Sequence, residues 1–122
     1  WSTLSLRQDR EARDFLAQSA SYLEPGSIVV SRSDERTFAL WYGTWASGEL
    51  PSDLVMVNDA LYQFDWYRRL LKQRYPTVKG VDQTADELVR QNRGERPIFL
   101  VDEIGILPED QLIAIGPLWK VK

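Results

Sequence analysis

Residues 25–34 read PGSIVVSRSD, and this stretch decides the fold. Pro and Gly end the segment before it, and the apolar β-branched run at residues 28–30 is typical of a buried strand. The polar residues that follow include Ser33 and Asp34, either of which suits the position just before a helix. The stretch therefore predicts a strand of residues 27–31 that leads directly into a helix, which is the repeating unit of an α/β protein.

The same alternation continues along the chain. Residues 54–57 and 97–101 are further apolar runs, as expected of strands covered on both faces, and residues 118–121 are typical of an edge strand. Apolar residues at three- and four-residue spacing, a capping box, and Pro or Gly stops mark the segments between them as helices. We therefore expect a three-layer α/β sandwich with a mainly parallel four-stranded sheet, Rossmann-like but lacking the dinucleotide fingerprint. The predicted helices cover residues 9–23, 37–48, 62–75, 84–94 and 108–115.

The composition excludes several classes of chemistry. The 122 residues contain no Cys and no His, which removes disulfides, thiolate and imidazole nucleophiles, and the metal ligands of the same types. Fifteen basic and eighteen acidic side chains give a net charge of −3, so no global attraction to nucleic acid is expected. Length and apolar content suit one domain over residues 1–122, with residues 1–8 as a candidate tail. No stretch of the sequence is long and apolar enough to span a bilayer.

Acidic side chains follow the three buried strands. Asp34 comes after the first strand, Asp59 after the second, and Asp102 with Glu103 after the third. Because ligands of open parallel sheets gather beyond the carboxyl ends of the strands, these acids could hold a divalent cation or act as an acid and a base. Capping of helices and turns is the favoured interpretation, so neither a metal nor a cofactor is expected.

The loop after the first strand completes the predicted binding set. Ser33, Asp34 and Thr37 could present hydroxyl groups and a helix N-terminus to a phosphate or a sugar, with Asp59 and Asp102 beside them. The loop contains no glycine, which disfavours close backbone approach to a pyrophosphate.

Aromatic residues crowd the helix predicted over residues 37–48. Helical spacing places Phe38, Trp41, Tyr42 and Trp45 on one stripe, which predicts that most of these rings are buried. Trp41 and Trp45 are nevertheless candidates for an exposed platform that binds a sugar or a partner protein.

The helix predicted over residues 62–75 is rich in Arg and Lys. We expect it to turn Phe64, Tyr67, Leu70 and Leu71 inward and its cations outward. Rings beside cations suit single-stranded nucleic acid, but rings and cations on opposite faces indicate a core face and a solvated face, so no nucleic-acid partner is expected. The basic face could instead meet anionic lipid head groups.

Four motifs within residues 10–76 resemble a known family. They are SIVVSRSD, TFALWY, LVMVN and DWY, in that order, starting at residues 27, 37, 54 and 65. Together they resemble the soluble C-terminal part of a bacterial family of uncharacterised multipass membrane proteins, whose members look like protein O-mannosyltransferases of the GT-C class. The GDNDTF-like loop of that family is matched here at Asp34 and Thr37, without its glycine and its second acid.

The resemblance implies a function for the chain. It implies a non-catalytic accessory domain at the extracytoplasmic face of the cell membrane, contacting the transmembrane part of its own parent chain and helping to recognise a sugar or protein acceptor. Two alternatives follow from the residues themselves. One is a stand-alone carboxylate- or metal-dependent hydrolase that uses Asp34, Asp59 and Asp102, and the other is a protein-interaction module with an exposed aromatic or basic helix face.

Overall fold

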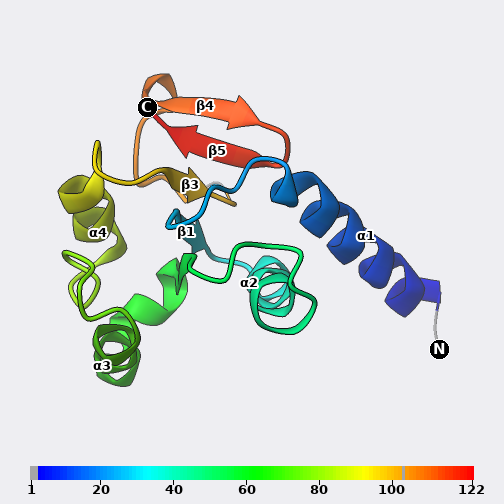
Figure 1. Ribbon diagram of the computed structural model, residues 1–122, viewed down its shortest axis with the longest axis horizontal. Helices are drawn as coiled ribbons and strands as arrows, with labels where there is room; N and C mark the ends of the chain where they lie inside the picture. The colour runs from blue at the N-terminus through cyan, green and yellow to red at the C-terminus, as the bar shows by residue number, and fades with distance from the viewer. Residues whose placement is uncertain (1–2, 103) are drawn as a thin grey trace.

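One open sheet of five strands organises the molecule, in the order β2-β1-β3-β5-β4 (Figure 1). The computed structural model describes residues 3–102 and 104–122. Strands β1, β2 and β3 are parallel to one another, whereas β5 runs antiparallel to both β3 and β4. The strands are β1 (Ile28–Ser31), β2 (Val55–Asn58), β3 (Ile98–Leu100), β4 (Leu112–Ile115) and β5 (Leu118–Val121). The helices are α1 (Thr3–Ala20), α2 (Asp34–Trp41), α3 (Asp65–Arg74) and α4 (Ala85–Asn92), with a π-helical turn η1 (Tyr42–Ala46) and 3-10 turns η2 (Asp59–Gln63) and η3 (Glu109–Gln111).

The prediction of a mixed α/β fold is confirmed, but the count of four strands is wrong. The segment predicted as a helix over residues 108–115 is only a 3-10 turn, followed by strand β4. A two-residue turn of Gly116 and Pro117 joins β4 to β5, with Ile115 paired to Leu118. Gly116 has a φ of 58°, a left-handed conformation that favours glycine. Pro108 and Gly116 suit the start and the end of a helix as well as they suit turns, so the sequence pattern indicated a helix where the chain forms a strand.

Apolar side chains pack on both faces of the sheet. Alternate residues of β1 supply the two cores: Ile28 and Val30 join the cluster that contains Tyr67 of α3, and Val29 joins the cluster that contains Leu40 of α2. Figure 1 shows α3 and α4 on one side of the sheet and α1 and α2 on the other. The strands are buried throughout in β1, β2 and β3, as their continuous apolar sequences predict.

The aromatic residues of α2 and η1 do share one stripe, but that stripe faces outward. Phe38 is 59% exposed, Tyr42 57% and Trp45 50%, and Trp41 is half-buried. The prediction that most of these rings are buried is therefore wrong. Smaller side chains face the sheet and α1 instead, because the helix packs too closely there for large rings; they are Thr37, Ala39, Leu40, Gly43 and Thr44.

Helix α3 begins later than predicted and buries fewer residues. It starts at Asp65 rather than near residue 62, because the 3-10 turn η2 precedes it. Tyr67 and Leu71 are buried as predicted, but Phe64 and Leu70 are exposed. Pro76 follows the helix and the chain turns there, as predicted.

Two tyrosine hydroxyls from this region close the free edge of strand β2. The backbone N–H of Asn58 donates to the hydroxyl of Tyr67 at 2.8 Å, and the N–H of Met56 donates to the hydroxyl of Tyr75 at 3.3 Å. These two N–H groups point away from β1, so without the tyrosines they would be open to pairing with another strand.

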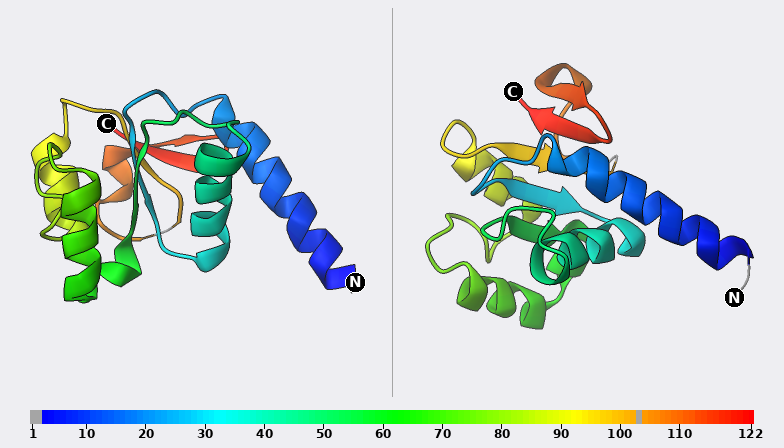
Figure 2. Two further views of the ribbon diagram at one scale, coloured as in Figure 1. Left: turned by 60° about the horizontal axis from the view of Figure 1, so that its bottom comes forward. Right: turned by 45° about the vertical axis from the view of Figure 1, so that its right-hand side comes forward.

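Helix α1 begins at Thr3, earlier than the predicted start at residue 9, so the chain from Thr3 to residue 8 is helical. Residues 1–2 of the predicted tail lie outside the described residues. The N-terminal half of α1 extends away from the rest of the molecule (Figure 2). Within the part of the chain that the structure describes, no helix combines the length and the apolar content needed to cross a bilayer.

Candidate functional site

The carboxyl ends of β1, β2 and β3 meet at one edge of the sheet, and Arg32 connects them. Arg32 follows β1, and its side chain pairs with Asp59, which follows β2; the Arg32 Nε to Asp59 Oδ2 distance is 3.1 Å. A terminal guanidinium nitrogen of Arg32 also donates to the backbone carbonyl of Ile104 at 3.2 Å. Asp59, one of the acids predicted to meet a ligand, therefore pairs with an arginine of the chain itself.

Asp102 bridges the sheet between β1 and β3. Its Oδ2 atom accepts hydrogen bonds from the backbone N–H of Arg32 at 2.9 Å and from that of Ser33 at 3.0 Å. The chain leaves β1 toward β2 on one side and returns to β3 on the other, so this is the point where the strand order reverses and where open α/β sheets commonly bind ligands. Here a carboxylate of the chain itself occupies the N–H groups that precede α2.

The remaining residues of the predicted set have structural roles or lie apart. The side chain of Ser33 accepts from the N–H of Arg36 at 3.3 Å, so Ser33 rather than Asp34 is the N-cap of α2. Asp34 is exposed in the first turn of that helix. Thr37 is buried and donates to the Ser33 carbonyl at 2.8 Å.

The side chain of Asn58 links α2 to the turn that follows β2. Its side-chain nitrogen donates to the Thr37 hydroxyl at 3.1 Å, and its side-chain oxygen accepts from the backbone N–H groups of Ala60 and Leu61. The Thr37 hydroxyl also lies 2.7 Å from that of Ser31. The sequence analysis placed Asn58 only at the end of a strand and gave Arg32 no role. The signal that could have pointed to them is their position, since Asn58 ends strand β2 and Arg32 follows strand β1.

This arrangement does not present a cation site. Within the described residues, no group of three or more acidic side chains could hold a metal ion. Glu103, which sequence reasoning placed beside Asp102, lies outside the described residues. The structure therefore brings Asp59 and Asp102 to the same edge, but as partners of Arg32 and of backbone N–H groups.

A partly apolar hollow adjoins Asp102. Trp119 of β5, Leu112 of β4 and Leu100 of β3 line it together with Ile104, and Glu109 stands at its margin with Asp102. An indole ring and two carboxylates in one hollow suit a cationic or hydroxylated small molecule better than an anion.

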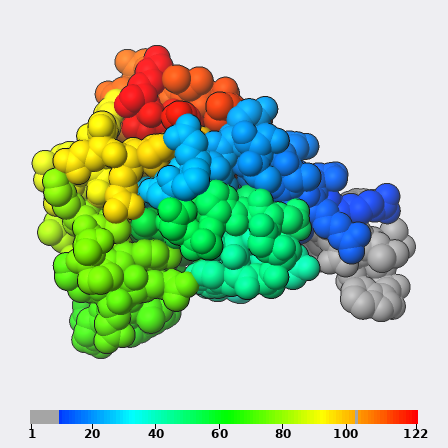
Figure 3. Space-filling view, in the orientation of Figure 1, coloured from blue at the N-terminus to red at the C-terminus, as the bar shows by residue number. Residues whose placement is uncertain are grey.

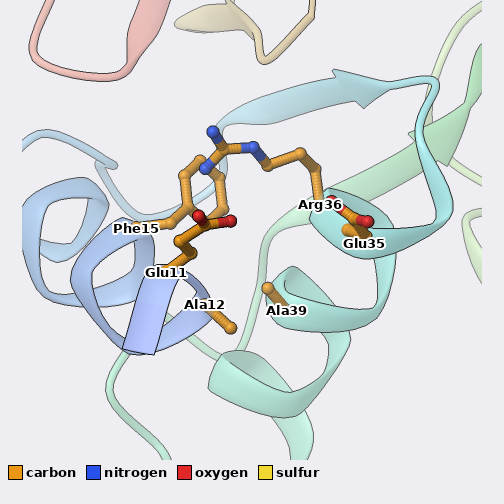
Figure 4. Close-up of a pocket in the computed structure, with 6 residues that line it drawn as sticks. All are labelled: Glu11, Ala12, Phe15, Glu35, Arg36 and Ala39. Atoms are coloured by element: carbon orange, nitrogen blue, oxygen red, sulfur yellow. The ribbon is translucent and has the colours of Figure 1, made fainter. Parts of the chain in front are cut away.

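A second hollow lies between α1 and α2, and a side chain of the protein fills much of it. The guanidinium of Arg36 lies over the ring of Phe15, 4.3 Å from its centroid, with Glu11 and Glu35 at the sides (Figure 4). This stacking attaches the C-terminal half of α1 to α2 and leaves little room for a ligand.

Exposed apolar side chains gather on two parts of the chain. Among the side chains described, six of the eight exposed large apolar residues lie on α2, η1 and the segment 64–70. We call this surface the aromatic band; it consists of Phe38, Trp41, Tyr42, Trp45, Phe64, Trp66 and Leu70.

The aromatic band has two groups of rings, one on α2 and η1 and one at the start of α3. Trp41 lies 5.8 Å from Trp45 in a stacked arrangement, and the guanidinium of Arg74 on α3 lies 4.4 Å from the Trp45 ring. On α3, Phe64 stacks on Trp66 at 5.9 Å. Figure 3 shows the residues of α3 beside those of the α2–η1 region along the lower margin of this face. The cation–π contact therefore joins the two helices below the edge strand.

Burial alters the acidity of two tyrosines beneath this surface. Burial raises the pKa of Tyr67 to about 12, although its hydrogen bond from the Asn58 N–H acts in the opposite direction. Burial likewise raises the pKa of Tyr62, whose hydroxyl donates to the Val81 carbonyl at 3.0 Å. Both hydroxyls are therefore held neutral and serve as structural hydrogen-bonding groups.

Comparison of the chain with known protein families, curated proteins and solved structures finds no match.

Proposed function

We propose that this chain is a binding module: a non-catalytic accessory domain of a membrane glycosyltransferase, located outside the cytoplasm, that helps to recognise a sugar or protein acceptor. The link to a glycosyltransferase rests on the resemblance of residues 10–76 described above. The binding role is supported by the aromatic band, because large contiguous apolar surfaces mark interaction sites in soluble domains.

The non-catalytic part of the proposal rests on what the strand-end acids contact. Asp102 accepts hydrogen bonds from two backbone N–H groups, and Asp59 pairs with Arg32. Both carboxylates therefore have structural partners in the loops that follow the strands. A metal-dependent hydrolase would require these acids and Asp34 around one ion, and the described residues form no such group.

We also propose a finer description of the fold. The parallel strands β2-β1-β3 with their helices form a Rossmann-like, three-layer unit, and the β4–β5 hairpin extends it on one side. In this description the Asp102 bridge occupies the position where a Rossmann-like protein would hold its ligand.

The reading frame upstream of Trp1 tests the membrane assignment. We expect it to encode several apolar segments of about 20 residues, each long enough to span a bilayer. An upstream frame without such segments would rule out the membrane glycosyltransferase and leave only the binding module.

Two assays of the 122-residue chain test the binding role. Hydrolysis of p-nitrophenyl phosphate with Mg²⁺ or Mn²⁺ should show no turnover, and turnover that Asp102→Asn abolishes would contradict the non-catalytic assignment. Soluble mannose oligosaccharides should change the tryptophan fluorescence of the chain, and Trp45→Ala should weaken that response while Ile113→Ala, an exposed residue on β4, should not.

A further inference from the structure

The aromatic band carries a charge pattern that identifies a partner more specific than an acceptor. Four of the fifteen basic side chains of the protein lie in the ten residues of α3, beside only one of its eighteen acids. The chain as a whole is acidic, so this concentration of positive charge is local to one helix. That helix is also the one that carries Trp66 and Leu70 of the aromatic band.

Rings and cations share the outer side of α3. Trp66 is 53% exposed and Leu70 48%, one helical turn apart, and Arg69, three residues after Trp66, is exposed as well. Lys72 is also exposed and lines a hollow with Arg69. The one acid of the helix, Asp65, is paired with Arg68. The separation of rings and cations onto opposite faces that the sequence predicted is therefore wrong for this helix, since Trp66 and Arg69 both face solvent.

The second helix of the aromatic band extends the same pattern. Trp45 is half-exposed with the Arg74 guanidinium against its ring, so this cation remains close to the exposed aromatic surface. The acids of α2, Asp34 and Glu35, lie in its first turn, at the opposite end from Trp45. Three acids lie near the four cations of α3: Asp65 on the same helix, Asp82, which lines a hollow with Arg69 and Lys72, and Asp53, which lines another with Arg74. The surroundings of α3 thus keep a small excess of positive charge, in contrast to the acidic chain as a whole.

We propose that the part of the aromatic band on residues 64–70, formed by Phe64, Trp66 and Leu70, is a docking surface for the anionic head groups of a lipid bilayer, which leaves the α2–η1 part to the acceptor. Trp, Phe and Leu side chains enter the boundary between head groups and acyl chains, and Arg and Lys beside them meet lipid phosphates; this combination characterises helices that lie on membranes. Phe64, Trp66 and Leu70 are all exposed within the short segment 64–70. This proposal goes beyond the function proposed above, because it concerns the described surface and stands whether or not the chain is tethered.

Vesicle co-sedimentation of the 122-residue chain tests the proposal. Vesicles of phosphatidylcholine containing about a third phosphatidylglycerol should bind the protein in about 0.1 M salt, and binding should fall sharply in about 1 M salt or on pure phosphatidylcholine. Brominated acyl chains should quench the tryptophan fluorescence on binding, and Trp66→Phe should remove part of that quenching.

Paired variants separate the apolar and the charged contributions. The double variant Trp66→Ala and Leu70→Ala should weaken binding by about ten-fold or more, because apolar area no longer leaves water. The double variant Arg69→Gln and Lys72→Gln should weaken binding about five-fold for each charge removed and reduce the salt dependence. All four side chains are exposed, so the circular dichroism and the urea midpoint should stay close to those of the unaltered chain.

Matched controls come from other parts of the surface. Ile113→Ala removes an equally exposed apolar side chain from β4, and Arg13→Gln removes an exposed cation from α1; both should bind vesicles like the unaltered chain. Equal binding by the Trp66 and Leu70 double variant, or no binding to anionic vesicles, would overturn the proposal. Salt-sensitive binding to polyglutamate without binding to vesicles would likewise overturn it, in favour of an acidic protein partner. None of these vesicle outcomes depends on the reading frame upstream, so the two proposals can fail separately.

Discussion

The Asp102 bridge makes the strongest quantitative prediction about the stability of the domain. Asp102→Ala removes the carboxylate oxygen that accepts hydrogen bonds from the N–H groups of Arg32 and Ser33, and with it the link between the end of β3 and the loop after β1. A hydrogen bond to a charged group contributes about 1.5 to 3 kcal/mol, and Asp102 is only half-buried, so the lower value applies to each bond. We therefore expect a loss of about 3 kcal/mol in the free energy of unfolding, which lowers the melting temperature of a domain of this size by about 10 °C.

The isosteric change Asp102→Asn separates the contribution of the charge from that of the two hydrogen bonds. Both N–H groups bond to the same carboxylate oxygen, so an amide oxygen in that position can still accept both. Only the charge is lost, and we expect a cost of about 1 kcal/mol. Asp110→Ala, which alters an exposed acid in the 3-10 turn before β4, should change stability by less than about 0.5 kcal/mol.

Urea unfolding followed by tryptophan fluorescence and by circular dichroism measures these differences. The expected order of midpoints is the unaltered chain and Asp110→Ala highest, then Asp102→Asn, then Asp102→Ala. If Asp102→Ala unfolded at the same midpoint as Asp110→Ala, the bridge would not hold β3 to the loop after β1. In that case Asp102 would be free to serve a ligand, and the non-catalytic assignment would lose its main support.

Other features of the structure make smaller predictions. Tyr67→Phe leaves the N–H of Asn58 without its partner and should cost about 1 to 2 kcal/mol near neutral pH, seen as a lower urea midpoint. Because burial raises the pKa of Tyr67 to about 12, above the ordinary value of about 10, its contribution is full below pH 10 and lost as the pH rises through 12; the midpoints of the two proteins should therefore converge over this range. Gly116→Ala should cost about 1 to 2 kcal/mol, since its φ is 58° and a Cβ there would lie 2.4 Å from the Tyr22 ring. Gly48→Ala, with a similar φ of 72° and no atom within 4 Å of its Cβ, should cost less, and equal losses would mean that the contact with Tyr22 has no effect.

The strands of the parallel core could be predicted from the sequence because their signal is local. The apolar runs at residues 28–30, 55–57 and 98–100 are short, continuous and rich in β-branched residues, and each follows a proline or a glycine closely, which is typical of a strand covered on both faces. Strand β4 could not be predicted in the same way. The four residues Leu112–Ile115 are compatible with either a helix or a strand, and their pairing with β5 decides between the two.

The orientation of the aromatic stripe also could not be predicted from the sequence. Periodicity shows that Phe38 and Trp45 share a face, but not whether that face meets the core. The core side is fixed by the close approach of α1, where a Cβ on Gly43 would lie 2.6 Å from Leu16. Hydrophobicity alone assigns the large rings to the interior, and packing space reverses that assignment.

The candidate site was predictable in place but not in detail. Acids at the ends of parallel strands converge because of topology, and Asp59 and Asp102 do meet at one edge. Asp59 contacts the long side chain of Arg32, whereas Asp102 contacts the backbone N–H groups of Arg32 and Ser33, and sequence spacing contains no information on either contact. The same holds for Tyr67 and Tyr75, whose hydroxyls find backbone groups of a strand nine and nineteen residues away.

The two ends of the sheet differ in a way that limits how copies of this protein can assemble. Tyr67 and Tyr75 occupy the outward N–H groups of β2, so a strand from another molecule cannot extend the sheet there. Strand β4 at the other end pairs only with β5. Any sheet formed between two molecules must therefore join β4 to β4, and such a pair has a tyrosine-sealed strand at each outer end. For the sheet of the described residues, growth through the edges therefore stops at two copies.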